Sequence, residues 1–289
     1  MTRRIRRRTV TLATALLLLG TTTIARASAH PSTELFRVIE VPGETQVFAR
    51  GINNRGAIVG YASDANFRQG GFIAFDHFIG QINFPDSLIT ISIGINDQSD
   101  IVGDLVAGNG VNSGFLLSKG QFTLIPNIHP EAINNRGDIV GVGSGGGVGF
   151  IRSEGVFSTF SVPNSISTRA HGINDRGQIV GDFEDVPFHE RGFLLWRGKF
   201  VTIEVPGSSR TEAVGINNLG QVVGKFVGSG GEQGFLWQDG RFTIISIPGS
   251  VTTNVFGIND RGQIVGIYVD TSGTLLAFES HVRAFLEHR

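Results

Sequence analysis

Histidine, glutamate and arginine residues gather at matched positions in the middle of the sequence. Each lies one or three residues before a recurring Gly-Ile-Asn or Ala-Ile-Asn triplet, in three consecutive copies of that triplet. Side chains alternate along a β-strand, so these two positions share one face of the strand. A histidine beside a carboxylate titrates near neutral pH and can serve in ligand binding or in general acid–base catalysis. The candidate ligand-binding residues are His129, Glu131, Arg169, His171 and Glu212.

These five residues are open to three interpretations. They could bind an anion or, through the histidines and glutamates, a metal ion. They could supply an acid, a base and an arginine for catalysis. Alternatively, they line a hydrated channel in which neighbouring glutamate and arginine side chains only satisfy each other. The sequence therefore assigns no catalytic residue, no metal ligand and no cofactor.

A tandem repeat must position these residues. The recurring asparagine runs from Asn53 to Asn259 with a mean period of about 41 residues, which is typical of propeller blades or helical arrays. The 41 glycines, the many β-branched residues and the lack of a period near 3.6 disfavour helices. The triplets of the six units begin at Gly51, Gly94, Ala132, Gly172, Gly215 and Gly257.

Each unit is predicted to form four short strands. In the fourth unit these are residues 168–173, 178–183, 192–196 and 199–205. The first two flank Asn174-Asp175-Arg176-Gly177, and Asn or Asp followed closely by Gly between two apolar runs indicates a hairpin. The second unit has Ser99 in place of that glycine, so its turn must differ. We expect these Asn-Asp turns to be turns and nothing more.

The two ends of the repeat region predict how the chain closes. Residues 36–43 match the fourth-strand segments 200–207 and 242–249, whereas the last unit stops after its third strand. The N-terminal strand is therefore expected to complete the last unit and remove open sheet edges. The prediction is an all-β fold, a six-bladed β-propeller closed by one N-terminal and three C-terminal strands. It forms one domain over residues 30–280, followed by a tail at 281–289.

A glycine-phenylalanine pair opens the third strand in five units. A bulky apolar residue repeated once per unit is expected to pack between blades. The sixth unit has Leu-Leu-Ala-Phe at 275–278 instead. The five phenylalanines are Phe72, Phe115, Phe150, Phe193 and Phe235.

The repeat resembles a known family. The core Gly-Ile-Asn-[Asn/Asp]-x-Gly-x-Ile-Val-Gly is followed by Gly-Phe-[Leu/Ile] and by a Phe-x-x-Ile-x-Val-Pro-Gly segment. This pattern is similar to the bacterial HAF-type extracellular repeat family and covers nearly all of the chain after its N-terminal segment. The resemblance implies an exported bacterial protein with a propeller-like fold, and it carries no catalytic motif.

The N-terminal segment is predicted to be an export signal. Five arginines precede an apolar stretch, and Ala27-Ser28-Ala29 matches the small-x-small pattern before a cleavage site. A signal peptide at 1–29 makes the protein secreted or periplasmic, and the sequence leaves Sec and twin-arginine export open. Removing six arginines from a formal net charge of −1 leaves about −7, which argues against a nucleic-acid partner. No later segment is apolar enough to span a membrane.

Standard catalytic and phosphate-binding signatures are not found, and there is no cysteine. The first functional expectation is therefore a secreted binding or scaffold module for an unknown extracellular or cell-envelope ligand or protein. The alternatives are a secreted lyase or hydrolase using the candidate residues at the channel mouth, and a purely structural exported protein. The charged segment 182–191 is expected to be a solvated loop beside that mouth.

Overall fold

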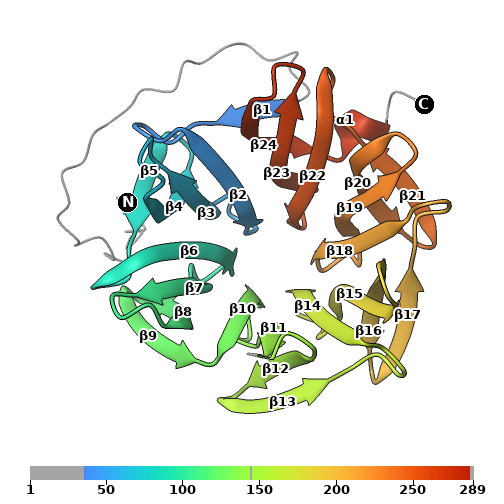
Figure 1. The fold of residues 1–289 in the computed structure, drawn as a ribbon, viewed down its shortest axis with the longest axis horizontal. Coiled ribbons are helices and arrows are strands. Elements are labelled where there is room, and N and C mark those ends of the chain that lie inside the picture. The colour runs from blue at the N-terminus through green and yellow to red at the C-terminus, as the bar shows by residue number, and fades with distance from the viewer. Residues whose placement is uncertain (1–35, 144, 287–289) are drawn as a thin grey trace, which may run out of the picture.

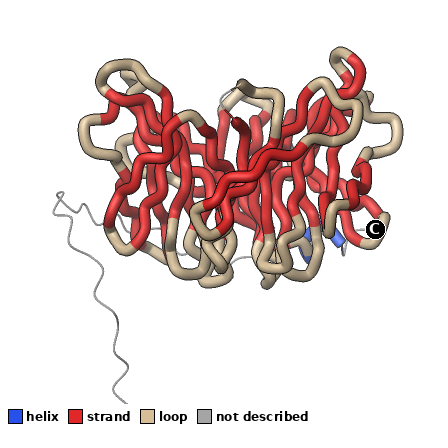
Figure 2. Tube along the Cα trace, turned by 90° about the horizontal axis from the view of Figure 1, so that it is seen from below, coloured by secondary structure: helices blue, strands red, loops and turns tan. Residues whose placement is uncertain are grey.

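The protein is an all-β propeller in which strands are arranged around a central axis (Figure 1). The structure is a computed structural model and describes residues 36–143 and 145–286. Seen from the side, the ring is a thick disc with loops at both faces (Figure 2). Within the described residues the only helix is α1 (Arg283–Leu286), which lies in the predicted tail. The predicted signal peptide lies outside the described residues.

Within each repeat the strands run antiparallel, and β2, β6, β10, β14, β18 and β22 are the strands nearest the axis (Figure 1). Each sheet is a meander, because sequential strands are joined by short turns. Four sheets have four strands each: β2 (Gln46–Ile52), β3 (Ile58–Ser63), β4 (Gln69–Phe75) and β5 (Phe78–Ile82); β6 (Ser87–Ile95), β7 (Ile101–Ala107), β8 (Asn112–Ser118) and β9 (Gln121–Pro126); β10 (Ile128–Ile133), β11 (Ile139–Gly143), β12 (Gly149–Ser153) and β13 (Val156–Phe160); β22 (Ser250–Ile258), β23 (Gln263–Asp270), β24 (Leu275–His281) and β1 (Phe36–Ile39).

The remaining strands form one eight-stranded sheet, which differs from the prediction of six separate four-stranded sheets. The physical reason is a single parallel bridge between Glu190 and Arg210, whose side chains also form an ion pair. This bridge joins two groups of strands that are otherwise internally antiparallel. The strands are β14 (Ser167–Ile173), β15 (Ile179–Val186), β16 (His189–Trp196), β17 (Lys199–Ile203), β18 (Arg210–Ile216), β19 (Val222–Gly228), β20 (Gly231–Gln238) and β21 (Arg241–Ile245).

The N-terminal strand of the described chain pairs with its C-terminal strand. Strand β1 runs antiparallel to β24, with Phe36 opposite Ser280 and Ile39 opposite Ala277. The two strands lie side by side at the outside of the ring (Figure 1). Strands far apart in the sequence therefore share one sheet.

The hydrophobic core lies between neighbouring sheets. One cluster joins Ile82 of the first sheet to Leu105 and Phe115 of the second. The repeated phenylalanine is at most 2% exposed in every unit. It is buried between its own sheet and the preceding one, as Phe115 is against Ile82. In the sixth unit Phe278 stands opposite Gly266, as Phe72 stands opposite Gly60, so it is the counterpart that the Leu-Leu-Ala-Phe sequence obscured.

Candidate functional site

The inner strand of each repeat contains a β-bulge at the candidate positions. Glu131 in β10, His171 in β14 and Arg50 in β2 are each an extra residue in the ladder with the following strand. Arg50 Nη2 lies 3.5 Å from Glu131 Oε2, although β6 separates their strands around the ring. Such a contact crosses the interior of the ring, so these bulge residues face the central channel.

The other candidate position, two residues before the bulge, stands opposite a residue of the second strand. Arg169 pairs with Asp182, and Glu212 pairs with Lys225. These partners directly follow the glycine of Ile-Val-Gly or Val-Val-Gly. At Gly181 a Cβ atom would lie 1.8 Å from the carbonyl oxygen of Arg169, so only glycine permits this close approach.

A continuous series of ion pairs, which we call the mouth network, joins the inner strands. Its members on these strands range from the bulge residues, three residues before the repeated asparagine, to Arg210 at the start of β18. Asp182 connects His171, at 2.5 Å, with Arg169, at 2.7 Å. Four of the five candidate residues belong to this network, and His129 does not. In order of contact, its members are Arg50, Glu131, His171, Asp182, Arg169, Glu190, Arg210, Glu212, Lys225 and Glu232.

Asp182 is the most deeply buried acid of the mouth network, with 1% of its side chain exposed. Burial raises the pKa of Asp182, but its contacts with His171 and Arg169 outweigh burial and lower it. Burial lowers the pKa of His171, yet the Asp182 hydrogen bond and the charges of Asp182, Glu131 and Glu212 raise it above its ordinary value. The Nδ1 atom of His171 also lies 4.0 Å from Glu131. Carboxylates near both ring nitrogens therefore favour the protonated form of His171.

His129 lies beside the mouth network and is not one of its members. Its Nδ1 atom lies 3.2 Å from Asp104 Oδ2, and 40% of its side chain is exposed. The other carboxylate oxygen of Asp104 is buried and has no hydrogen-bond partner. Burial and the nearby charge of Glu131 raise the pKa of Asp104 to about 6. We call Asp104, His129 and Glu131 the acid–histidine group.

The opposite side of the channel is lined by apolar and aromatic residues. The rings of Phe48 and Tyr61 are stacked, with centroids 4.6 Å apart. The guanidinium of Arg50 lies over the ring of Phe256, 4.5 Å from its centroid. Arg50 therefore connects the aromatic wall with Glu131. The channel mouth combines a charged half with an aromatic half.

The sequence candidates leave out Arg50, Arg210 and Glu232 of the mouth network and four further residues of this site. Asp104, Asp182 and Lys225 share the position after the repeated Val-Gly, which holds five different residue types in the six units, and that variation was the available signal. The fourth is Glu190. The expected loop at 182–191 is the hairpin of β15 and β16, and it supplies both Asp182 and Glu190 to the mouth network.

The inner strands end at a closed ring of hydrogen bonds, which we call the asparagine ring. The side-chain amide nitrogen of each repeated asparagine donates to the backbone oxygen of the next one, at 3.0–3.2 Å. Asn259 donates to Asn53, which closes the circle. Each side-chain oxygen also accepts two backbone amides of its own turn, as Asn217 does from Leu219 and Gln221.

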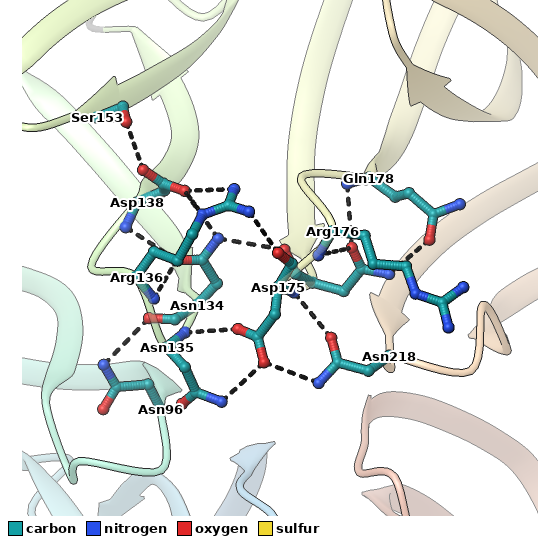
Figure 3. A network of polar contacts seen from close by, with 11 residues as sticks. Asn96, Asn134, Asn135, Arg136, Asp138, Ser153, Asp175, Arg176, Gln178 and Asn218 are labelled. Atoms are coloured by element: carbon teal, nitrogen blue, oxygen red, sulfur yellow. Dashed lines mark hydrogen bonds and ion pairs between the residues drawn. The ribbon is translucent and has the colours of Figure 1, made fainter.

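The next residue of each turn forms a second closed ring, the Asn/Asp ring, in which the two residue types alternate. Around the axis the members are Asn54, Asp97, Asn135, Asp175, Asn218 and Asp260. Each asparagine donates both hydrogens of its side-chain amide to the aspartates on either side. Figure 3 shows Asp175 accepting such bonds from Asn135 and Asn218. The turns are therefore more than turns, since they link the repeats to one another.

Two further observations concern the described residues as a whole. In residues 36–143 and 145–286, no set of three histidine, aspartate or glutamate side chains is placed to hold a metal ion. No helix in that part of the chain has the length and apolar character needed to cross a membrane.

Solved structures share this fold at low sequence identity, whereas no protein-family model and no curated protein sequence matches the chain. TolB from Acinetobacter baumannii has a TM-score of 0.55 and 14% identity over 78% of this chain and 63% of TolB. AofleA from Arthrobotrys oligospora has a TM-score of 0.54 and 10% identity over 81% and 82%. The β-propeller domain of the Trilobed protease from Pyrococcus furiosus, described as having an open velcro topology, has a TM-score of 0.53 and 11% identity over 81% and 95%. At these identities the similarity establishes that the chain has a propeller fold, and nothing finer.

Proposed function

We propose that the protein is a six-bladed propeller of the HAF-type extracellular repeat family, exported from the cell. The eight-stranded sheet counts as two blades, because one bridge is all that joins its halves. Strand β1 would then supply the outer strand of the last blade, as its pairing with β24 supports. The repeated Gly-Ile-Asn core supports the family, and the N-terminal arginines and apolar stretch support export.

We further propose that the protein is a binding module whose ligand contacts the acid–histidine group at the channel mouth. The observation that carries this proposal is the unpartnered Oδ1 atom of Asp104. A buried acceptor without a partner is costly, and a ligand that donates a hydrogen bond would remove that cost. The paired charges of Arg169, His171 and Glu212 instead hold the wall of the channel in place.

The chemistry of the channel mouth limits the ligand. Asn254 Oδ1, on the inner strand β22, is a buried oxygen that also has no partner, and both it and Asp104 Oδ1 are acceptors. Beside them the aromatic wall of Phe48 and Phe256 offers an apolar surface. A ligand with hydrogen-bond donors on one side and an apolar face on the other fits both halves. An extracellular or cell-envelope molecule of this class is the proposed partner.

The two alternative functions have less support. A lyase or hydrolase needs a base that can accept a proton, and His171 is held between Asp182 and Glu131 with a raised pKa. A purely structural protein has no use for a buried carboxylate oxygen without a partner in its channel. Binding is therefore the function that the geometry supports best.

A ligand screen tests this proposal. The exported protein would be mixed with sugars, amines, small anions and divalent metals, and its thermal midpoint measured. A ligand at a hundred times its dissociation constant adds about 2.7 kcal/mol of stability, which raises the midpoint by several degrees. The shift should disappear in Asp104→Asn and in the His129→Ala/His171→Ala double variant.

The matched control is Asp239→Asn, which changes an exposed turn residue in the same way. Its ligand-induced shift should equal that of the wild type. A shift that survives in Asp104→Asn would move the ligand away from the channel mouth. If no compound shifts the midpoint, the result would favour a purely structural protein over a binding module.

A further inference from the structure

A second candidate ligand site lies where the chain passes from β1 to β2. Elsewhere, the connection from one outer strand to the next inner strand usually contains Ser-x-x-Thr. The serine Oγ donates to a backbone oxygen three residues earlier, and the threonine Oγ1 accepts the amide of that same earlier residue. The four pairs are Ser87 and Thr90, Ser165 and Thr168, Ser208 and Thr211, and Ser250 and Thr253.

The β1–β2 connection keeps the turn but replaces both hydroxyl residues. The amide of Glu44 donates to the carbonyl oxygen of Val41 at 3.1 Å, as the amide of Ser208 does to Val205. Glu44 stands in place of the serine and Val47 in place of the threonine. Neither residue can reproduce the hydroxyl pair. The β1–β2 connection, like the one-residue β9–β10 connection, therefore departs from the other four connections.

The same repeat also lacks the side chains that fill this region elsewhere. Ala62 of β3 stands opposite Gly70 of β4. The corresponding pairs in four of the other repeats are larger: Leu105 and Ser113, Phe183 and Arg191, Phe226 and Gln233, and Tyr268 and Leu276. The third repeat has Gly143 at the position of Ala62. The missing side-chain volume leaves a pocket of about 380 Å³. That volume is in the range of small-molecule sites.

Polar groups converge on this junction pocket. The Oε2 atom of Glu44 is buried and has no hydrogen-bond partner. Burial raises the pKa of Glu44, and the charge of Asp64 raises it further. Asp64 is fixed by its Oδ1 atom, which accepts the backbone amides of Asn66 and Arg68. The polar side chains of the lining are Glu44, Asp64, Arg68, Gln69, Gln81 and Asn83, above a floor that includes Phe72.

We propose that the junction pocket binds a small hydroxylated primary amine. A protonated amine beside Glu44 and Asp64 would pair with the unmet carboxylate oxygen and offset the repulsion between the two acids. The side-chain amides of Gln69, Gln81 and Asn83 each offer both donors and acceptors, which suits hydroxyl groups. An amino sugar combines both features at a size that the pocket admits.

The test uses glucosamine and glucose, which have the same shape and differ by an amine in place of a hydroxyl. Binding to the exported protein would be measured by isothermal titration calorimetry. We expect glucosamine to bind at least ten times more tightly than glucose. Equal affinity for the two sugars would overturn the recognition of the amine, and no binding of either would overturn the site.

Two variants place the binding in this pocket. Glu44→Ser/Val47→Thr installs the hydroxyl pair that other connections use, so it should fold, melt no lower than the wild type and lose at least ten-fold in glucosamine affinity. Ala62→Phe fills the pocket as Phe183 and Phe226 do in their repeats and should also abolish binding. Unchanged affinity in a folded form of either variant would refute the proposal.

The control is Glu40→Ser, which removes one acid from an exposed position four residues before Glu44. Its glucosamine affinity should equal that of the wild type, and an equal loss there would mean that overall charge explains the binding. Asp104→Asn at the channel mouth should leave the affinity unchanged. The outcome is therefore independent of the ligand proposed for the mouth.

Discussion

The two ends of the central channel are built on opposite principles. At the asparagine and Asn/Asp rings, all six repeats contribute the same small set of residue types, and their side-chain hydrogen bonds close on themselves. At the mouth, equivalent positions hold Phe48, Ile91, His129, Arg169, Glu212 and Asn254. Uniformity marks the end that holds the repeats together, whereas variation marks the end that is available for recognition.

The comparison is not absolute, because part of the mouth is also structural. The mouth network pairs most of its charges, as the interpretation of mutually satisfied channel walls anticipated. Outside this network, Ser92 Oγ, Asp104 Oδ1 and Asn254 Oδ1 on the inner and second strands are buried without a hydrogen-bond partner. Variation alone is thus a weak guide to function, and unmet hydrogen bonding within a variable region is a better one.

The largest expected effect on stability comes from Asp182→Asn, which would remove the central ion pairs of the mouth network. Removing this charge leaves Arg169 and His171 without their buried partner, and we expect a loss of about 3–5 kcal/mol in the free energy of unfolding. The measurement is urea unfolding across a range of pH.

The pH dependence of that loss has a defined sign. The lowered pKa of Asp182 means that its contribution is present above the ordinary aspartate pKa and fades as pH falls through the folded value. The raised pKa of His171 means that its contribution is present below about 6.5 and fades as pH rises through the folded value. The loss should therefore be greatest between about pH 4 and pH 6.5. A loss that does not vary with pH would show that Asp182 acts by shape alone.

Asn217→Ala would interrupt the asparagine ring at the uniform end of the channel. We expect it to lower the free energy of unfolding by about 3 kcal/mol. Its side chain bonds to the backbone oxygen of Asn259 and to the amides of Leu219 and Gln221, all of which would lose a buried partner. The thermal midpoint should fall by roughly 6–12 °C. Asn109→Ala in an exposed loop is the control. A comparable fall in its thermal midpoint would show that the asparagine ring contributes no more to stability than an exposed asparagine does.

Asp104→Asn should have the smallest effect on stability, and in the opposite direction. Because the pKa of Asp104 is raised to about 6, the fold favours its protonated form, and stability is lost as pH rises through that value. A neutral asparagine avoids this loss, so the variant should be roughly 1–2 kcal/mol more stable at pH 7.5 and little different at pH 4. If the variant and the wild type are equally stable at both pH values, the charge of Asp104 does not destabilise the fold.

The repeat made much of the fold predictable from the sequence, because its turns and alternating strands are local signals. A shared inward face for His129, Arg169 and Glu212 was predicted from strand alternation. The bulges at Glu131 and His171 interrupt that alternation, and the sequence pattern did not reveal them.

What could not be predicted depends on contacts between repeats. Asp104 contacts His129 of the neighbouring sheet, and the bridge from Glu190 to Arg210 joins two groups of strands into one sheet. The asparagine ring likewise joins residues about 40 positions apart. A sequence pattern within one unit contains no information on the partner in the next unit, so these features appear only once the ring is assembled.

The alternation in the Asn/Asp ring imposes a rule of parity. Each aspartate only accepts side-chain hydrogen bonds and each asparagine amide donates to both sides, so the circle closes without a mismatch only for an even number of members. Inserting or deleting a single repeat would bring two like residues together, whereas a pair could be gained or lost without penalty. Repeats should therefore be gained or lost in pairs, because only an even number lets the hydrogen bonds of the Asn/Asp ring close.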